Sequence, residues 1–468
     1  MPAHRLIEIE WPDYGMPTPP KRASRENLAR NLDLMRERMK ERGYTHLVVY
    51  GDREHFANIL WASGFDPRFE EAVLVVREDG APLLLAGNEG HDYTPVSAAV
   101  VAGDIRTARC QSLSLLSQPR GDRTRLVDMV TAEGISTTSK VGVIGWKYYS
   151  ATETDDPAHA LEVPSILADG LRRAAGHDNV ENATDLFMHP GHGLRSVVTV
   201  DEIAAFEFAN SLASAAMRRM LFALRDGVSD LDVYAAGRVA GLPLGCHPTF
   251  AVGANRHLGL GGPTGEIVRT GDPMSFNLCH FGANIARSGW LASGPDDLPR
   301  DARDYVDAFA GPYVVALSEW FSMMRPGTRG GDVHAMIQNR LPFETFGIFL
   351  NPGHLIHHDE WVSSPIFEGS DLPLRSGMAM QVDIIPSHPV YNSTRMEDGI
   401  VIADEALQTD LARAHPAVLK RCLARRAFMR DVVGLDVPDT VLPLSDTAGI
   451  VPPYFFAPKK ILALSANA

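Results

Sequence analysis

LRDGVSDLDVY (residues 224–234) and MRPGTRGGDVH (residues 324–334) align without gaps at an offset of 100 residues. Four of the eleven positions are identical, pairing Arg225 with Arg325, Gly227 with Gly327, Asp232 with Asp332 and Val233 with Val333. Each segment follows a predicted long helix and precedes a shorter helix and strands. This internal repeat predicts two α+β units related by a pseudo-two-fold axis, with strands curved around a central cleft that could bind a ligand.

The helix before the first of these segments has a clear start signal. Thr-Val-Asp-Glu (residues 199–202) is a capping-box sequence, and apolar residues then recur at helical spacing as far as Met220. A second long helix is predicted over residues 301–324. We therefore predict an α+β domain over residues 179–405, followed by a C-terminal helix and an apolar tail over residues 406–468.

The first part of the chain is predicted to form a smaller α/β domain. A helix begins after Ser24 and ends at Gly43, which occupies a C-cap position. Buried strands are predicted over residues 45–51, 71–79, 81–87 and 141–146. Helices and strands alternate here, which predicts an α/β domain over residues 23–178, preceded by an irregular Pro-rich arm over residues 1–22.

Composition excludes several classes of protein. The chain has 468 residues and a formal net charge of -14, without a run of Lys or Arg, so nucleic acid is not an expected partner. No uninterrupted apolar stretch reaches the length of about 18 residues that a membrane span needs. The four cysteines form no CxxC pair and the N-terminus has no apolar signal region, so we expect a cytoplasmic protein with reduced thiols.

Five short motifs follow one another in the C-terminal half. They are GDPMSFN (271–277), NIARS (284–288), NPGH (351–354), LRSGMAMQVD (374–383) and RMEDGI (395–400). In this order they resemble the motifs of creatinases, prolidases, Xaa-Pro aminopeptidases and methionine aminopeptidases. The resemblance implies a pita-bread fold for the C-terminal domain and a creatinase/prolidase-like N-terminal domain, and it implies an enzyme.

The metallopeptidases of this family hold two divalent ions with two Asp, one His and two Glu. The matching positions here are Asn277, Asn284, His354, Asp383 and Glu397. The two amides remove two negative charges, so a pair of divalent ions would face only two carboxylates. We therefore expect no dinuclear metal centre and no required cofactor. A single divalent ion could still be held by His354, Asp383 and Glu397.

Creatinase resembles this chain in carrying Asn at the first Asp position, and it hydrolyses a guanidinium C–N bond without metal. The resemblance implies catalytic roles for His354, Asp383, Glu397 and His257, with His354 or His257 as the acid/base. It implies substrate contacts for Asn277, Asn284, His358 and Arg68. It also implies a homodimer in which each N-terminal domain contributes to its partner's cleft. The chain departs from creatinase at Ala286, where creatinase has Glu, and His257 is displaced from the catalytic His by a few residues.

The leading hypothesis is a creatinase-like hydrolase that cleaves a C–N bond of a small polar or cationic substrate without metal. One alternative is a metal-dependent Xaa-Pro dipeptidase or aminopeptidase with an altered ligand shell. A lyase of the dimethylsulfoniopropionate-lyase type is a second alternative, because HLIHHDEW (354–361) resembles a segment of those enzymes. A pseudoenzyme that binds a ligand through the retained cleft is the third.

Overall fold

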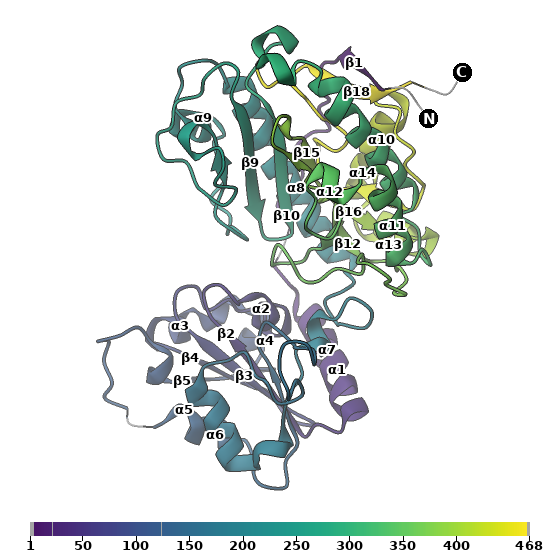
Figure 1. The fold of residues 1–468 in the computed structure, drawn as a ribbon. Coiled ribbons are helices and arrows are strands. Elements are labelled where there is room, and N and C mark those ends of the chain that lie inside the picture. Colours follow the sequence, from purple (N-terminus) through teal and green to yellow (C-terminus); the bar gives the residue numbers. More distant parts are fainter. Residues whose placement is uncertain (1–3, 21, 123, 466–468) are drawn as a thin grey trace. The chain divides into compact units, whose positions relative to one another are not determined.

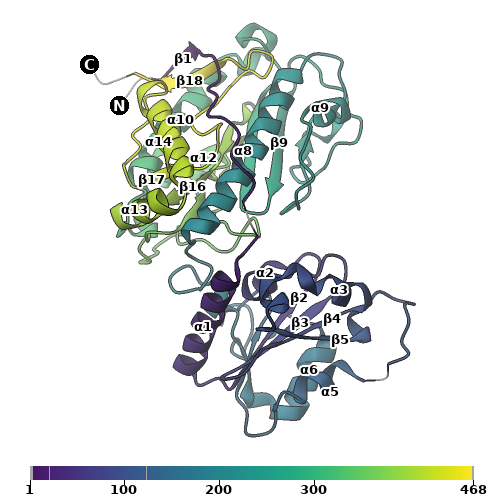
Figure 2. The ribbon, with the colours of Figure 1, turned by 180° about the vertical axis from the view of Figure 1, so that it is seen from behind.

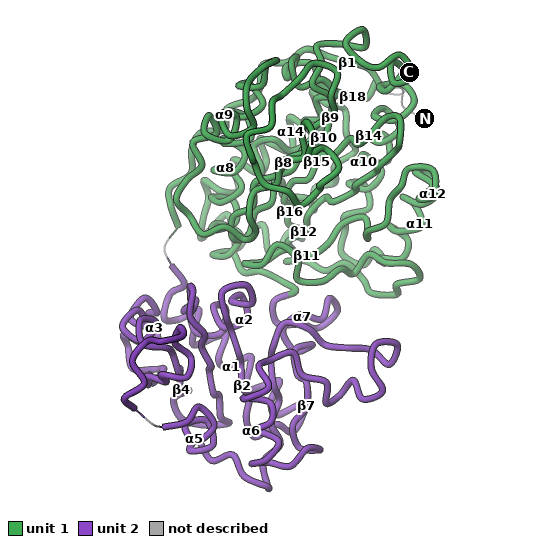
Figure 3. Tube along the Cα trace, turned by 60° about the vertical axis from the view of Figure 1, so that its left-hand side comes forward, with its two compact units in different colours: residues 1–20, 196–468 green, residues 21–195 purple. Residues whose placement is uncertain are grey.

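The computed structural model describes residues 4–20, 22–122 and 124–465 (Figures 1 and 2). The chain divides into two compact units, which Figure 3 distinguishes by colour. Unit 2 comprises residues 21–195, and unit 1 comprises residues 1–20 together with 196–468. No helix within the described ranges has the length and hydropathy that a membrane span requires.

Unit 2 is built on a six-stranded mixed sheet with the strand order β5-β4-β3-β2-β6-β7. The strands are β2 (His46–Gly51), β3 (Ala72–Arg77), β4 (Leu83–Ala86), β5 (Arg106–Arg109), β6 (Val141–Ile144) and β7 (Val180–Asn182). The helices are α1 (Arg25–Arg42), α2 (Ala57–Ser63), α3 (Asn88–Tyr93), α4 (Ala98–Val101), α5 (Leu126–Thr131), α6 (Ser165–Ala175) and α7 (Asp185–Met188). Apolar side chains of α5 and α6 join those of β2, β3 and β6 in one buried cluster.

The local signals in this half produce the expected elements. The Ser24 hydroxyl accepts a hydrogen bond from the Asn27 N–H, and Gly43 ends α1 in the left-handed region at φ 70°. The strands β3 and β4 pair antiparallel on either side of Gly80, which has φ 75°. Unit 2 extends past residue 178 because β7 continues the sheet by pairing parallel with β6.

Unit 1 contains two four-stranded sheets, ordered β15-β10-β9-β8 and β11-β12-β16-β17. The first sheet contains β8 (Phe250–Ala251), β9 (Pro273–His280), β10 (Ala283–Trp290) and β15 (Arg395–Glu397). The second contains β11 (His354–Leu355), β12 (Ala379–Gln381), β16 (Gly399–Ile402) and β17 (Val441–Pro443). Asp398 alone separates β15 from β16, so the chain passes from one sheet to the other at this residue.

Helices surround these sheets. The helix α8 (Val200–Ala223) packs along β9 and β10, as Figure 2 shows, and begins at the predicted capping box of Thr199 and Glu202. The other helices are α9 (Asp230–Ala236), α10 (Gly311–Ser322), α11 (Gly330–Arg340), α12 (Phe343–Phe346), α13 (Glu405–Ala414) and α14 (Pro416–Asp431). A short hairpin, β13 (Ser387–His388) with β14 (Asn392–Ser393), completes the unit.

The helix predicted over residues 301–324 is shorter and interrupted in the structure. Residues Val306–Ala310 form a π-helical turn, in which the Gly311 N–H donates to the Val306 carbonyl, and the α-helix α10 starts only at Gly311. The reason is Pro312, which has no N–H and therefore cannot donate the α-helical hydrogen bond to the turn before it.

The two repeated segments have the same local structure. Gly227 and Gly327 have φ of 84° and 91°, and each donates its N–H at 2.9 Å to a carbonyl of a later segment, that of Val268 or that of Leu374. An isolated antiparallel bridge follows in each, between Ser229 and Ile267 or between Arg329 and Pro373. The helices α9 and α11 then begin one residue after the bridge.

The arm predicted to be irregular contains a strand. β1 (His4–Glu8) pairs antiparallel with β18 (Lys460–Leu464), and Ile9 and Trp11 behind it are buried. Both strands lie at the same end of unit 1 in Figure 1. The prediction was wrong here because the partner strand lies near the other end of the chain. The apolar C-terminal tail also packs on the unit, since the Phe455 N–H donates to the Trp290 carbonyl at 2.8 Å.

Candidate functional site

A buried polar cluster lies where the two sheets of unit 1 meet. Asn277 comes from β9, Asn284 from β10, and Glu397 from the end of β15. The strand register places Asn277, Ala286 and Glu397 in one row across the sheet. Because every second residue faces the same side of a strand, Asn284 lies on the face of Ala286. The small side chain of Ala286 therefore sits between the two polar residues of the row.

Arg395 bridges two carboxylates of this cluster. Its Nη2 lies 2.8 Å from the Asp383 Oδ1 and also donates to the Glu397 Oε2. Its Nε lies 3.2 Å from the same Asp383 oxygen. The side chains of Asp383 and Glu397 are 4% and 0% exposed, so the guanidinium neutralises charges that water hardly reaches.

The two amides form a hydrogen-bonded chain that ends on the carboxylates. The Asn284 Nδ2 donates to the Glu397 Oε1 at 2.8 Å and to the Glu360 Oε1 at 3.3 Å, while its Oδ1 accepts from the Asn277 Nδ2 at 3.2 Å. The Asn277 Oδ1 in turn accepts from the Thr249 N–H at 2.7 Å and from its hydroxyl at 3.0 Å. Both amide oxygens are therefore engaged by protein donors.

His354 is fully buried among three carboxylates. Its Nε2 lies 3.2 Å from the Glu360 Oε1, 3.8 Å from the Asp383 Oδ2 and 3.9 Å from the Glu397 Oε1. The ring stacks on Trp361 with centroids 4.1 Å apart. Burial acts to lower the pKa of His354, but the neighbouring carboxylates, chiefly Glu360, outweigh it and raise the pKa to about 10. The imidazole is therefore positively charged at neutral pH.

Glu397 also holds its proton more strongly than an ordinary carboxyl does. Burial raises its pKa to about 7, and the nearby Asp383 charge adds to the rise while Arg395 opposes it. Burial also acts to raise the pKa of Glu360, yet the positive charge of His354 dominates and lowers it. The cluster thus contains one carboxyl that titrates near neutral pH beside an imidazolium that does not, an arrangement suited to proton transfer.

The structure brings five of the predicted site residues together: Asn277, Asn284, His354, Asp383 and Glu397. It adds two that the sequence reasoning did not assign to the site. Glu360 follows His354 by six residues within the segment HLIHHDEW, and Arg395 precedes Glu397 by two residues on the same strand. The alternation of β15 was the available signal for Arg395, because residues two apart face the same side.

The other three predicted residues are His257, His358 and Arg68. His257 is exposed, and within the part of the chain that the structure describes it makes no hydrogen bond or ion pair. The ring of His358 packs against Phe206 and Phe281, with centroids 6.0 Å and 6.2 Å away. Arg68 belongs to unit 2, where it has a positive φ of 61° and pairs with Asp66 at 3.8 Å.

Among the residues that the structure describes, two groups of side chains have the composition of a metal site. In the cluster, ligand atoms of His354, Glu360 and Glu397 lie within 4.8 Å of one another, so Glu360 takes the place that the sequence assigned to Asp383. The cluster does not fit a pair of divalent ions, because the Arg395 guanidinium is already hydrogen-bonded to the carboxylates of Asp383 and Glu397. Both amide oxygens also accept hydrogen bonds from the protein. The other group lies in unit 2 and contains Asp156, His159 and His177.

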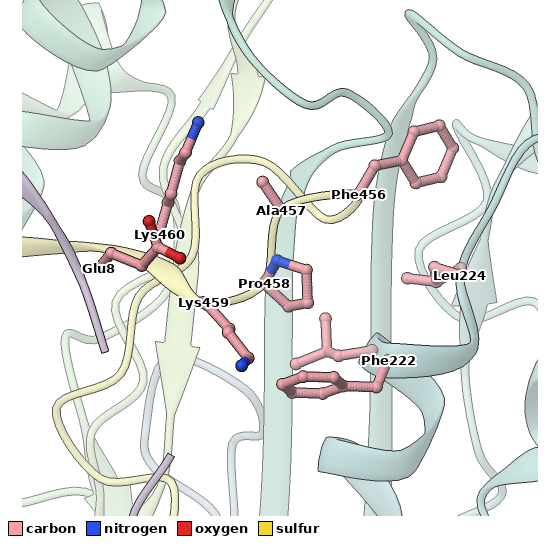
Figure 4. Close-up of a pocket in the computed structure, with 9 residues that line it drawn as sticks. Glu8, Phe222, Leu224, Phe456, Ala457, Pro458, Lys459 and Lys460 are labelled. Atoms are coloured by element: carbon pink, nitrogen blue, oxygen red, sulfur yellow. The ribbon is translucent and has the colours of Figure 1, made fainter. Parts of the chain in front are cut away.

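A separate hollow on unit 1 lies outside the polar cluster (Figure 4). It is lined by Glu8, Leu221, Phe222, Leu224, Phe456, Ala457, Pro458, Lys459 and Lys460. Phe222 is 44% exposed and Lys459 pairs outward with Glu10. The lining combines apolar carbon with the Glu8 carboxylate and two lysine ammonium groups.

No protein-family model and no curated protein sequence matches the chain. Solved structures do match it. A prolidase from Pyrococcus horikoshii OT3 is 14% identical with a TM-score of 0.61 and covers 80% of this chain and 95% of its own. An Xaa-Pro dipeptidase from Bacillus anthracis is 16% identical with a TM-score of 0.60, and the match covers 81% of this chain and 96% of the dipeptidase. The N-terminal domain of FACT complex subunit SPT16 from Cicer arietinum is 14% identical with a TM-score of 0.57, and the match covers 81% of this chain and 95% of that domain. The chain therefore has the pita-bread fold that its motifs predicted, the fold of prolidases and Xaa-Pro dipeptidases.

Proposed function

We propose that this chain is a metal-independent, creatinase-like hydrolase that cleaves a C–N bond of a small polar or cationic substrate. The observation that carries the proposal is the Arg395 guanidinium, which bridges Asp383 and Glu397. In metal-dependent members of the fold, as the motifs imply, carboxylates at these positions face divalent ions. Here a side chain of the protein supplies the positive charge.

The charges of the cluster support this proposal. Three carboxylates, those of Glu360, Asp383 and Glu397, face two resident cations, the guanidinium of Arg395 and the imidazolium of His354. A divalent ion about 4 Å from a guanidinium is repelled by about 8 kcal/mol at an effective dielectric constant of about 20. Two such ions would need more carboxylates than the cluster has, and neutral amides do not replace them.

In the proposed reaction Glu397 is the general base and His354 the general acid. A carboxyl with a pKa of about 7 can take a proton from water at neutral pH. The His354 imidazolium can donate a proton to the leaving nitrogen, or it can stabilise the oxyanion that forms when water attacks the carbon. Asn284 orients the Glu397 carboxylate through its 2.8 Å hydrogen bond, and Arg395 holds the other oxygen.

The proposed enzyme acts as a homodimer, in which Arg68 of one copy would bind a substrate carboxylate in the cleft of the other. The exposed Arg68 guanidinium, 3.8 Å from Asp66 and 5.9 Å from the centre of the Tyr93 ring, is available for such a contact. Arg68→Ala should then raise KM without lowering kcat, and the purified chain should elute as a dimer. A monomer with full activity would contradict this part of the proposal while leaving the chemistry intact.

The decisive experiment measures turnover and metal content together. Chelator-treated protein is assayed on guanidino, amidino and N-alkyl amino acids and on Xaa-Pro dipeptides, with and without Mn²⁺, after elemental analysis. The proposal predicts metal-free turnover of a non-peptide substrate, abolished in Glu397→Gln and His354→Gln. Turnover confined to Xaa-Pro dipeptides and dependent on Mn²⁺ would instead support a dipeptidase that holds one ion on His354, Glu360 and Glu397.

A ligand-binding protein without catalysis is the second candidate. It is favoured by the pairing within the cluster, in which each carboxylate already has a partner. No turnover on the whole panel, together with a metabolite that co-purifies and binds tightly, would support this candidate over the hydrolase.

A further inference from the structure

Two histidines and an aspartate of unit 2 meet on its surface, in a place that the proposed reaction does not use. His159 and Asp156 belong to the loop between β6 and α6, and His177 begins a 3₁₀ turn just after α6. Their ligand atoms lie within 4.8 Å of one another. We propose that Asp156, His159 and His177 form a binding site for one divalent transition-metal ion such as Zn²⁺.

The geometry is close to that of an open zinc site. The His159 Nδ1 lies 2.8 Å from the Asp156 Oδ1, and the centroids of the two imidazoles are 5.0 Å apart. Ligands that sit about 2.0–2.2 Å from a tetrahedral zinc ion are about 3.3–3.6 Å from one another. Atoms at the 4.8 Å limit need to approach by little more than 1 Å, while the His159 Nδ1 and the Asp156 Oδ1 need to separate by about 0.5 Å. Side chains that are 54% exposed for Asp156 and 55% for His177 can rotate to achieve this.

The orientation of His177 supports the same conclusion. Its Nδ1 lies 3.3 Å from the Asp178 Oδ1, which leaves the Nε2 lone pair for an ion. Histidines that bind metals usually donate their other ring N–H to a carboxylate or a carbonyl in this way, because the hydrogen bond fixes the tautomer and the ring. A carboxylate next to each histidine, Asp156 for His159 and Asp178 for His177, also increases the negative potential at the site.

The backbone around the cluster is already fixed, so little order must be created on binding. The Ala160 N–H donates to the Asp156 carbonyl at 3.1 Å, which closes a turn. Asn182 of β7 fastens that turn by donating its backbone N–H to the Ala158 carbonyl and its side chain to the Ala160 carbonyl, both at 2.7 Å. Arg172 of α6 donates to the His159 carbonyl at 2.6 Å. An ion would add a further link between this loop and the end of α6.

The ligand set indicates the class of ion. Imidazole suits Zn²⁺, Ni²⁺, Cu²⁺ and Co²⁺, whereas Ca²⁺ and Mg²⁺ prefer oxygen ligands alone. Three protein ligands on an exposed surface leave the remaining coordination positions to water. This inference does not depend on the proposed hydrolase, because the cluster of unit 1 shares no residue with the site.

The test is a Zn²⁺ titration of the chelator-treated full chain, followed by calorimetry. The wild type should bind Zn²⁺ with a dissociation constant that rises at least tenfold in His159→Ala, His177→Ala and Asp156→Asn. The control His192→Ala, which removes an exposed histidine paired with Asp185 in the same unit, should bind like the wild type. Glu360→Gln should also leave this binding unchanged, which separates the site from the cluster of unit 1.

Two further readouts keep the result clear. Cu²⁺ bound to the wild type should show nitrogen hyperfine structure in its electron paramagnetic resonance spectrum, and the double variant of His159 and His177 should lose it. Zn²⁺ should raise the melting temperature of the wild type but not of that double variant, and circular dichroism confirms that the variant is folded. Equal Zn²⁺ binding by the wild type and the double variant, or no binding by either, would overturn the inference.

Discussion

Replacing Arg395 with Met should destabilise unit 1 by several kcal/mol. The guanidinium is shared by Asp383 and Glu397, whose side chains are 4% and 0% exposed. Two carboxylates that contact the same nitrogen lie within about 5 Å of each other, and at an effective dielectric constant of about 20 their mutual repulsion is about 3 kcal/mol. Together with the lost ion pairs, this predicts a loss of about 3–5 kcal/mol in the free energy of unfolding at alkaline pH, where both carboxyls are ionised.

The assay is urea unfolding followed by tryptophan fluorescence, with two control variants. Arg395→Lys keeps the charge but not the forked geometry, so it should lose less than Arg395→Met. Arg413→Met removes an exposed cation that pairs with Asp410 at 2.7 Å, and such pairs contribute at most about 1 kcal/mol. An Arg395→Met variant that is as stable as Arg413→Met would refute the view that Arg395 is the essential counter-ion of the cluster.

The free energy of unfolding that Arg395→Met loses should also depend on pH in a defined direction. Without Arg395, the pKa of Glu397 should rise further above its usual value, because Arg395 lowers this pKa more than His354, the other neighbour that lowers it. A carboxyl whose folded pKa is raised stabilises the fold while it is protonated, and this contribution disappears as the pH rises through that pKa. The difference from the wild type should therefore be smaller at about pH 6 than at about pH 8. An increase toward acid pH would contradict the assignment.

Three further outcomes are expected. The kcat/KM of the hydrolase should rise as the pH rises through about 7, because Glu397 must lose its proton to act as the base, and a flat profile around neutral pH would argue against that role. Thr199→Ala should cost about 1 kcal/mol in urea unfolding by removing the cap of α8, whereas Thr199→Ser should cost much less. Asp398→Asn should cost about 3–5 kcal/mol because it leaves the buried Arg287 without its 2.7 Å partner, and a stable variant would show that carbonyl acceptors suffice.

Local signals in the sequence predicted the elements whose ends depend on neighbouring residues. Ser24 and Gly43 mark the ends of α1, and the capping box at Thr199 marks the start of α8, because each interaction spans only a few residues. The strand β1 had no such signal, since its partner β18 is more than 450 residues away. The π-helical turn before Pro312 could not be predicted either, because the sequence does not show which carbonyl loses its hydrogen-bond donor.

In the candidate site, too, some residues could be predicted from the sequence and others could not. Asn277, Asn284, His354, Asp383 and Glu397 were found because the order of the motifs identified their positions. The pairing of Arg395 with both Asp383 and Glu397 could not be found in this way, because it requires a loop after β12 to approach β15. Motif order predicted which residues meet, but the charge balance of the cluster became visible only from the distances between side chains.

The pairing of β1 with β18 has a consequence for how the chain is made. The residues of β1 are synthesised about 456 residues before those of their partner strand. At a synthesis rate of about 5–20 residues per second, β1 waits about 20–90 seconds with an open edge. Unit 2, which is continuous from residue 21 to residue 195, can fold during that interval. A nascent chain that stalls before residue 460 should therefore present a folded unit 2 and an unpaired strand that invites association with other chains.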